Sequence, residues 1–497
     1  MPLTTRRLAI AIFFIGLFAM AMRVAVDSDT FWHLRAGTWM LDNQRLLNFD
    51  AFSHTRLDQP WINHSWLTEI AMAALYRLGG FGALNLATAL VVWLTFFFVY
   101  RPGAGGSYLR IFVILLAAVA SAVYWSARPQ IVSMLLAAVF NAILLDYRRR
   151  GVNRLWLLPL IMLAWVNLHG GFAIGFILLV ITFVGHLLPL SRRLPAGMGG
   201  GGDHKGRPYA QMLWLGGTGL ACALAACLNP YGPAMLLYPF KTVSIGVLQN
   251  YIQEWQSPNF HARETQVFIL LWLATFGAVG FSRRRLSLTD FLLFSVFSAL
   301  ALLAGRNIAV FAVVAAPILM LHGDAAIAEL QAHAPALRLS ENIASPARTL
   351  LILNWAIVVA VTLAAAAKAA LPLLPAATQD AVAGASPVGA AAYLRVNPPP
   401  GLMFNSYNFG GYLAWALYPQ TPVYVDGRTD LYDNAFLTDY LNTTSAGPGW
   451  QAALDSAYIG FVVVESNSPL ARELQRTPNW AVRYRDPLAV VIVRTSP

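Results

Sequence analysis

Cysteine is almost absent from this sequence. Cys222 and Cys227 are the only two among 497 residues, and both lie inside one apolar run. Five residues apart on a helix, they do not face each other, so we expect no disulfide between them. No HExxH or CxxC pattern occurs anywhere in the chain, which argues against a zinc hydrolase.

Charged residues are also scarce. They make up 11% of the chain, whereas an average soluble protein carries about 25%. Hydrophobic residues account for 58%, and windows of 17 to 22 apolar residues recur. Each window is long enough to cross a hydrocarbon core about 30 Å thick. The composition therefore predicts an α-helical polytopic membrane protein, with membrane lipids as its surroundings.

Eleven apolar segments are candidates for the spanning helices. They cover residues 8–26, 82–100, 109–125, 129–146, 155–168, 171–190, 210–228, 266–281, 288–305, 307–322 and 349–371. The first follows Arg6-Arg7, as the core of a cleaved signal peptide also would. Because this core is long and many spans follow, we favour a retained first helix.

The net charge of +11 is unevenly distributed. Residues 385–497 carry 7 Arg and 8 acidic residues, so the whole excess lies in the first 384 residues. The basic residues cluster in short loops: Arg6-Arg7, Arg148–Arg150, Arg192-Arg193, Lys205, Arg207 and Arg283–Arg285. This is the positive-inside signal, which predicts topology and implies no nucleic-acid partner. We expect a multi-pass protein of the inner (plasma) membrane with a cytoplasmic N-terminus and an extracytoplasmic C-terminal domain.

The same topology divides the chain into parts. Residues 1–371 form the predicted transmembrane domain, and residues 27–81 are its first external loop. The cytoplasmic loop 191–209 contains Gly199 to Gly202 and is typical of a flexible connector. Residues 372–387, rich in Ala and Pro with little to pack, are predicted to be a linker to an external domain at 388–497.

Residues 388–497 have a different sequence pattern from the long apolar runs before them. Apolar β-rich runs at 422–425, 459–464 and 489–493 alternate with helical patterns at 410–417 and 467–476. Strands that alternate with helices favour a small α/β domain with a mostly parallel sheet.

The first external loop carries the sharpest chemical signal. Asp27-Ser28-Asp29 directly follows the first apolar run. Two carboxylates in this spacing can share a divalent cation such as Mg²⁺ or Mn²⁺, or one can act as a base. If residues 29–40 form an interfacial helix, Asp29 and His33 share a face. The alternative is that Asp29 simply caps that helix.

The motif DSDTFWHLRAG, followed by an interfacial helix, resembles the first external loop of the GT-C superfamily of membrane glycosyltransferases, which includes oligosaccharyltransferase catalytic subunits and protein mannosyltransferase-like enzymes. The phrases FDAFSHT, PWINHSWLTE, YNFGGYLAWAL and VDGRTDLY resemble an uncharacterised bacterial branch. The resemblance implies a polyprenyl-phosphate-linked sugar donor and an inverting transfer to an extracytoplasmic acceptor. It also implies that Asp27 or Asp29 is the base or a metal ligand.

In this superfamily a later external loop commonly supplies a second acidic group, and Glu254 is the candidate here. The C-terminal domain lacks a WWDYG-type acceptor motif, which puts transfer to an Asn-X-Ser/Thr sequon in doubt. A lipid phosphate needs a cation nearby. Arg suits it best. The candidates at external helix ends are Arg128, His169, Lys241 and Arg306. For Arg128 the alternative is snorkelling.

The external loops hold further ligand-type side chains. These are His33, Asp50, His54, His64 and Glu69 in the first loop, and His261 and Glu264 in a later one. His33 and His64 are candidates for substrate binding. For His54 and His64 the alternative is hydrogen bonding within the loop, beside Trp61 and Trp66.

A second group of candidates lies at the probable strand ends of the C-terminal domain, where open α/β sheets bind ligands. The group is Asn405, Tyr407, Gly410-Gly411, Asp426, Arg428 and Asp430. A helix opened by Gly410-Gly411 can accept an anion. A tight turn with a surface Asp-Arg pair explains the same residues, and residues 388–497 contain no GxGxxG or P-loop.

Three functions fit this sequence. The leading one is a GT-C-like transferase. The second is a non-catalytic membrane scaffold or accessory subunit that keeps the fold. The third is a carrier for lipid-linked sugars. The polar residues lie at the external ends of the spans rather than within them, which argues against transport.

Overall fold

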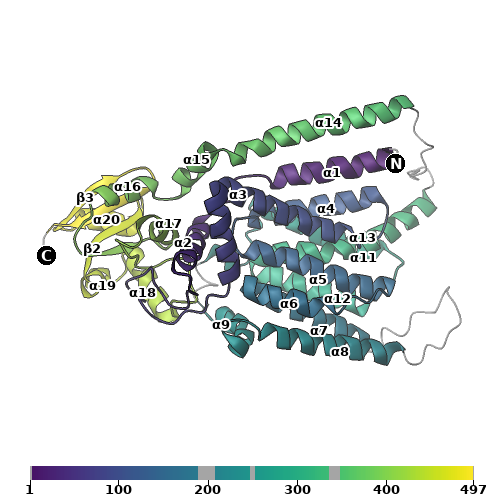
Figure 1. Ribbon diagram of the computed structural model, residues 1–497, viewed down its shortest axis with the longest axis horizontal. Coiled ribbons are helices and arrows are strands. Elements are labelled where there is room, and N and C mark those ends of the chain that lie inside the picture. The colour runs from purple at the N-terminus through teal and green to yellow at the C-terminus, as the bar shows by residue number, and fades with distance from the viewer. Residues whose placement is uncertain (1–2, 188–206, 247–251, 335–347, 496–497) are drawn as a thin grey trace.

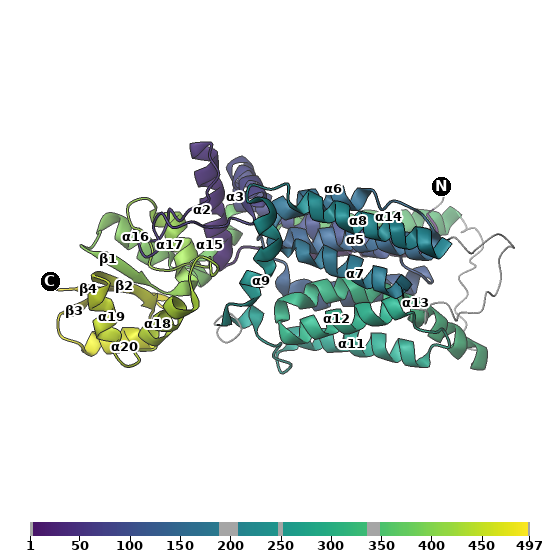
Figure 2. The same ribbon diagram turned by 90° about the horizontal axis from the view of Figure 1, so that it is seen from below.

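The computed structural model describes residues 3–187, 207–246, 252–334 and 348–495. A long helical bundle carries a C-terminal lobe at one end, which we call the lobe end (Figures 1 and 2). Most of the predicted 191–209 loop, with Arg192-Arg193, Gly199–Gly202 and Lys205, lies outside the described residues.

Every predicted apolar segment contains a helix of the bundle. The helices are α1 (Thr5–Ala21), α3 (Trp66–Tyr100), α4 (Ser107–Ser121), α5 (Gln130–Arg150), α6 (Leu157–Leu168), α7 (Ala173–Leu187), α8 (Arg207–Ala226), α11 (Arg263–Phe281), α12 (Leu288–Leu303), α13 (Ile308–His333) and α14 (Arg348–Ala370). Within the described residues, seven helical segments are long and apolar enough to cross a membrane, and three shorter helices are apolar. The chain is a multi-pass membrane protein, whereas the exact number of eleven spans stays a prediction.

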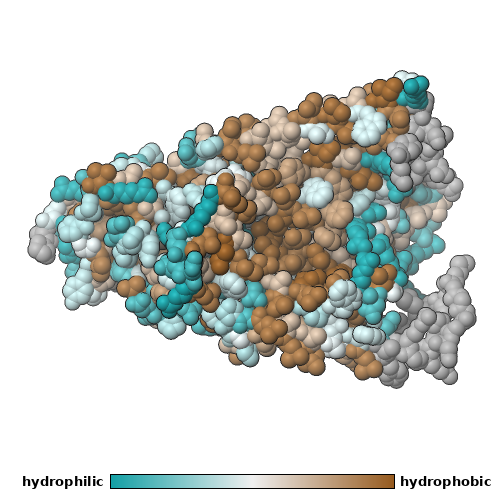
Figure 3. Space-filling model, in the orientation of Figure 1, coloured by the Kyte–Doolittle hydropathy of each residue, from teal (hydrophilic) through white to brown (hydrophobic). Residues whose placement is uncertain are grey.

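The apolar surface of the bundle forms a band between two polar ends (Figure 3). Inside the band, the first half of α13, from Ile308 to Met320, is buried on all sides, and Phe311 is fully buried. A helix that is apolar all round belongs in such a central position. At the end far from the lobe, Arg148 pairs with Asp290 at 2.9 Å. Arg148, which belongs to one of the arginine clusters that predict the cytoplasmic face, is therefore part of a buried ion pair.

Short helical segments join the bundle helices at the lobe end. They are η1 (Ala122–Tyr124), η2 (Gly170–Phe172), η4 (Gly232–Leu237), α9 (Tyr238–Val243), η5 (Gln253–Trp255) and η6 (Gly305–Asn307). These segments and α2 lie between the bundle and the lobe, as α2 and α9 show in Figure 2.

The predicted interfacial helix is α2 (Ser28–Asn43). Its N-cap is Asp27 rather than Asp29, because the Asp27 side chain accepts from the amides of Asp29 and Thr30. Helix α2 packs tightly on the start of α3. A Cβ on Gly37 would lie 2.0 Å from the Glu69 carbonyl oxygen, so only glycine permits this approach. Helix α3 bends at Gly79-Gly80, where the helical dihedrals are interrupted.

The predicted linker is helical and mostly exposed, with a few buried contacts to the bundle. It forms η8 (Leu371–Leu373) and α15 (Pro375–Ala385). The Asn85 side chain of α3 donates to the Pro372 carbonyl at 2.8 Å, and both Pro372 and Thr378 are buried. Alanine favours helix strongly. The linker therefore continues from α14 into the lobe as ordered structure.

The lobe contains a four-stranded sheet with helices on both faces. Its elements are α16 (Val388–Val396), β1 (Leu402–Asn405), α17 (Tyr407–Leu417), α18 (Asn434–Thr444), α19 (Trp450–Ser456), β2 (Ile459–Glu465), α20 (Pro469–Arg476), β3 (Trp480–Arg485) and β4 (Ala489–Arg494). The strand order is β1-β2-β4-β3. Only β1 and β2 pair in parallel, so the predicted mostly parallel sheet is wrong. Residues 422–425 form no strand: Val423 makes a single bridge to Ser53.

The first loop and the lobe share one hydrophobic core. Phe31 and Trp39 of α2 pack in the same cluster as Phe409 and Leu413 of α17. A Cβ on Gly411 would lie 2.6 Å from the Ser28 carbonyl oxygen. Gly410 and Gly411 therefore lie inside α17 as close-packing residues, and the predicted anion site at a helix start is wrong.

Candidate active site

Arg128 is the centre of a charged cluster at the lobe end. It lies in the turn between η1 and α5, and its Nε is 2.9 Å from Asp27 Oδ2. Its Nη1 lies 2.6 Å from Asp29 Oδ2, and its Nη2 lies 2.9 Å from Glu254 Oε2. One guanidinium thus joins the two acids of the DSD motif to an acid more than two hundred residues away in the sequence.

Arg306 extends the cluster. Its Nη1 lies 3.5 Å from Glu254 Oε1, and its guanidinium stands over the Trp255 ring at 4.4 Å. The side chain of Arg306 is 25% exposed, whereas that of Arg128 is 14% exposed. Three carboxylates and two guanidinium groups leave the cluster with a net charge of −1 when all are ionised. Within the described ranges Arg306 has one acidic partner, at 3.5 Å, and so has the greater capacity for a further anion.

Asp29 is the least compensated acid of the cluster. Burial, with a smaller contribution from the charges of Asp27 and Glu254, outweighs the lowering effect of Arg128 and raises the pKa of Asp29 to about 6. For Glu254 burial also raises the pKa, but the charges of Arg306 and Arg128 outweigh burial and hold its pKa below the usual value. At neutral pH both acids are ionised, and Asp29 is the one poised to take a proton.

The backbone holds the two aspartates differently. Asp27 Oδ1 accepts from Asp29 N at 3.0 Å and from Thr30 N at 3.1 Å, so this side chain is fixed as the cap of α2. Asp29 Oδ1 accepts from Trp32 Nε1 at 3.2 Å. The lobe closes over it, because a Cβ on Gly427 would lie 2.2 Å from Asp29 Oδ1. Only glycine at this position lets the 426–430 segment approach the carboxylate.

The predicted divalent cation does not fit this arrangement. Three carboxylate groups converge, but the guanidinium of Arg128 contacts all of them and fills the position that a cation would need. Among the described residues no group of three or more His, Cys, Asp or Glu side chains is arranged to hold a metal ion. The positive charge of the site is therefore supplied by arginine.

Behind the cluster lies a buried chain of polar side chains. His33 Nδ1 is 2.8 Å from Glu69 Oε1, and Asn63 Nδ2 donates to Glu69 Oε2 at 2.6 Å. Burial lowers the pKa of His33 well below its usual value, and the charges of His64, Arg128 and His169 add to this. His33 is therefore neutral. Its Nδ1 contacts Glu69 rather than Asp29, although His33 and Asp29 lie on the same helix.

His64 and His169 belong to a neighbouring group. Their rings lie 5.7 Å apart, and His64 stacks on Tyr238 at 4.7 Å. The Tyr238 hydroxyl lies 2.6 Å from His64 Nδ1 and 3.2 Å from Asp430 Oδ2. His169 Nδ1 accepts from the amide of Gly171 at 3.0 Å. Burial lowers the pKa of both histidines.

Other predicted ligand residues lie apart from the cluster. His54 Nε2 lies 2.9 Å from the carbonyl of Met403 in β1, so this side chain bonds to the lobe rather than within its own loop. Lys241, His261 and Glu264 are exposed. Asn405 is buried and donates to the Val425 carbonyl at 2.8 Å.

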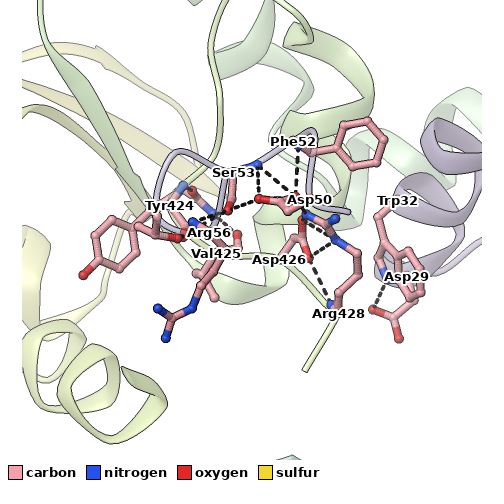
Figure 4. Close-up of polar contacts among 12 residues, drawn as sticks. Asp29, Trp32, Asp50, Phe52, Ser53, Arg56, Tyr424, Val425, Asp426 and Arg428 are labelled. Atoms are coloured by element: carbon pink, nitrogen blue, oxygen red, sulfur yellow. Dashed lines mark hydrogen bonds and ion pairs between the residues drawn. The ribbon is translucent and has the colours of Figure 1, made fainter. Parts of the chain in front are cut away.

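Arg428 is an internal residue, and the predicted surface pair with Asp426 is wrong. Its Nη2 lies 2.6 Å from Asp426 Oδ2 and 2.7 Å from Asp50 Oδ1, and all three side chains are fully buried (Figure 4). Asp50 also accepts from the Ser53 amide at 3.1 Å. This triad ties the first loop to the lobe and sets the position of Gly427 against Asp29. Sequence analysis missed Gly427, although the VDGRTDLY phrase contains it.

An apolar cavity opens beside the histidine group. Its volume is about 660 Å³, and its walls come from η2, α7, α8, η4 and α9. Phe172, Phe176, Leu236 and Phe240 are among its lining residues. It lies where α7 and α8 meet the short segments of the lobe end, the end that also carries Arg128.

Comparisons with known proteins find similar solved structures but no similar sequence family. No family model matches the sequence, and no curated protein matches it. The structure is similar to the oligosaccharyltransferase AglB from Archaeoglobus fulgidus, with a TM-score of 0.55 and 10% identity over 92% of this chain and 69% of that one. It is similar to ArnT from Cupriavidus metallidurans, with a TM-score of 0.50 and 15% identity over 97% and 96%.

The arabinofuranosyltransferase AftD from Mycobacteria is also similar, with a TM-score of 0.52 and 15% identity, and there the match covers the whole of this chain and 40% of that one. Likeness at such low identity establishes a common fold. The chain therefore shares the fold of these three proteins, as the resemblance of the DSDTFWHLRAG motif implied.

Proposed function

We propose that this protein is a glycosyltransferase of the inner (plasma) membrane that moves a sugar from a polyprenyl-phosphate-linked donor to an extracytoplasmic acceptor. The observation that carries the proposal is the Arg128 cluster: two first-loop acids and Glu254 meet one guanidinium. The solved structures of AglB and ArnT contain a dolichol-phosphate and undecaprenyl phosphate, respectively. The apolar cavity beside His169 offers the isoprenoid tail of such a donor a place.

Asp29 is the base in this proposal. The acceptor oxygen attacks the anomeric carbon, the bond from that carbon to the phosphate oxygen breaks, and the bonding electron pair leaves with the lipid phosphate. The acceptor proton passes to Asp29, whose pKa of about 6 suits proton transfer near neutral pH. A single displacement of this kind inverts the anomeric centre. Asp27, fixed as a helix cap, positions Arg128 rather than reacting.

Arg306 and the histidine group receive the donor phosphate. Arg306 keeps part of its guanidinium exposed and has one acidic partner at 3.5 Å. Arginine binds phosphate oxygens with two parallel hydrogen bonds and stays charged. His169 is neutral and accepts from Gly171 at Nδ1, so its Nε2–H can be donated without adding charge. Together they stabilise the charge that develops on the leaving phosphate.

The experiment compares cell-surface glycans from cells that carry the wild-type protein, Asp29→Asn or Asp42→Asn, by mass spectrometry. Asp42 lies on the same helix but is half exposed and pairs with Arg77, so its substitution is the matched control. Asp29→Asn is expected to abolish the glycan change that the wild-type protein produces, and Asp42→Asn is expected to preserve it. Full transfer by a folded Asp29→Asn protein would favour the non-catalytic scaffold instead.

Donor binding has a separate test. Purified wild-type protein is expected to retain polyprenyl phosphate, and Arg306→Met is expected to weaken this binding at least tenfold. The exposed Arg283 at the other end serves as the control for loss of one arginine charge. Equal binding by the wild-type protein and Arg306→Met would remove Arg306 from the phosphate site.

A further inference from the structure

A second cavity, of about 250 Å³, lies in the lobe. Its walls come from α17, α18, β2 and α20, and one residue, Ile252, comes from the bundle just before η5. The polar lining residues are Ser406, Tyr407, Asn408, Thr429, Tyr440, Thr444, Glu465 and Ser468. The volume is just below the range of about 300 to 1,000 Å³ that is usual for small-molecule sites, so it suits one sugar ring better than a peptide.

The charge of the lining is informative. Among the described lining residues Glu465 carries the only carboxyl group, and there is no Arg, Lys or His. The Ser406 hydroxyl donates to Glu465 Oε1 at 2.6 Å, which holds the carboxylate at the cavity wall. A cavity with this charge repels phosphate and other anions. It offers hydroxyl, amide and carboxylate groups to a ligand rich in hydroxyl groups.

Two aromatic side chains complete the wall. The Tyr440 hydroxyl accepts from the amide of Tyr407 at 2.6 Å, so the two tyrosines are held together at the start of α17. Aromatic rings beside polar groups form the mixed surface that a sugar ring needs, because one face of a sugar is apolar and its edges carry hydroxyls. Leu437 and Leu441 add apolar area.

The cavity adjoins the Arg128 cluster through the chain itself. Ile252 precedes Glu254 by two residues, and Thr429 follows Gly427 by two. Tyr407 lines the cavity and also feels the charge of the cluster. Burial raises its pKa well above the usual value, and the charge of Asp29 adds to this effect. A ligand seated in the cavity therefore has one side facing the segment that closes over Asp29.

We propose that this cavity is the acceptor subsite and that it binds the end of an uncharged saccharide, whose hydroxyl is presented to Asp29. The proposal rests on the proposed transferase function and narrows it, because it excludes an anionic acceptor and a peptide. The reaction is the displacement described above: the saccharide oxygen forms the new glycosidic bond, and its proton goes to Asp29.

Two substitutions test the subsite in the full-length protein in its own cells. Glu465→Gln removes the charge but keeps an oxygen for Ser406, and Asn408→Phe puts a large apolar group on an exposed lining position. Glu473→Gln, which removes an exposed charge from α20, is the matched control. Mass spectrometry of the surface glycans measures the extended and unextended acceptor.

Both cavity variants are expected to lower the ratio of extended to unextended acceptor at least tenfold, while Glu473→Gln matches wild type. Polyprenyl phosphate binding is expected to stay unchanged in both, which shows that they fold and that the donor side is intact. The unextended species that accumulates is expected to be a neutral saccharide.

Several results would overturn the inference. If Asp29→Asn blocks extension but Glu465→Gln and Asn408→Phe extend normally, the cavity is not the acceptor subsite and the transferase function stands. If the accumulating species is a phosphorylated lipid, an anionic polymer or a protein, the acceptor class is wrong. If Asp29→Asn changes no glycan, the transferase proposal fails, and the subsite fails with it.

Discussion

The pKa of Asp29 gives the sharpest prediction for this protein. Burial raises it from 3.8 to about 6, which corresponds to about 3 kcal/mol against the ionised form. A base must be ionised to accept a proton, so transfer is expected to rise with pH between 5 and 7. With a pKa of about 6, about a tenth of the protein is active at pH 5 and about nine tenths at pH 7, a rise of roughly tenfold.

The same shift affects stability in the opposite direction. Because the folded state binds this proton more tightly than the unfolded state, the contribution to stability is full below pH 3.8 and is lost as pH rises to about 6. The thermal unfolding temperature of the wild-type protein, taken relative to Asp29→Asn, is therefore expected to fall across this interval. The stability measurement needs no substrate and checks the pKa independently of activity.

Arg128→Met tests the origin of the pKa. The charge of Arg128 lowers the pKa of Asp29, so its removal is expected to move the rising part of the pH profile to higher pH. Arg128→Lys keeps the charge and is expected to move it less. Transfer is measured in membranes with their own donor and acceptor, with the external pH varied from 5 to 8. A flat profile from pH 5 to 7, or one that Arg128→Met leaves in place, would refute the assignment of Asp29.

Three other perturbations have definite expected outcomes. Gly427→Ala is expected to lower transfer at least tenfold, because the new Cβ would overlap the carboxylate of the base, whereas Gly384→Ala on the exposed face of α15 changes nothing. Arg428→Met leaves two buried carboxylates without their cation and is expected to cost about 3 to 5 kcal/mol; thermal unfolding should show this loss, with the exposed Arg476→Met near wild type. EDTA is expected to leave transfer unchanged, because Arg128 already supplies the cation; loss of transfer, restored by Mg²⁺ or Mn²⁺, would contradict this.

The sequence predicts the helices well and the sheet poorly, for physical reasons. Each long apolar run must be helical to satisfy its backbone hydrogen bonds in lipid, so the run itself defines the element. Strand order depends on pairing between distant segments, and β4 lies between β2 and β3 only because Val491 and its neighbours pair on both sides. No local pattern contains that information.

For the site, the sequence identifies the residue types but not their partners. Asp27, Asp29, Arg128, Glu254 and Arg306 are all recognisable as polar residues at the ends of apolar runs, and the structure brings them together. That one guanidinium would contact three carboxylates follows only from the packing of helices far apart in the chain.

Buried polar residues and glycines show the limits of the sequence most clearly. Arg428 has the composition of a surface residue, and its burial depends on Asp50, which lies in the first loop. Gly427 carries no side chain, so its role is visible only where its neighbours are known. Such residues can be predicted once a partner segment is placed, and not before.

The shared core of α2 and α17 has a practical consequence for anyone who wishes to study the C-terminal lobe. A fragment that begins at residue 388 would lose the aromatic side chains Phe31 and Trp39, against which Phe409 and Leu413 pack. Those apolar surfaces would then face water, and exposed patches of this kind cause aggregation. The proposed saccharide site is therefore best tested in nanodiscs that hold the intact polypeptide.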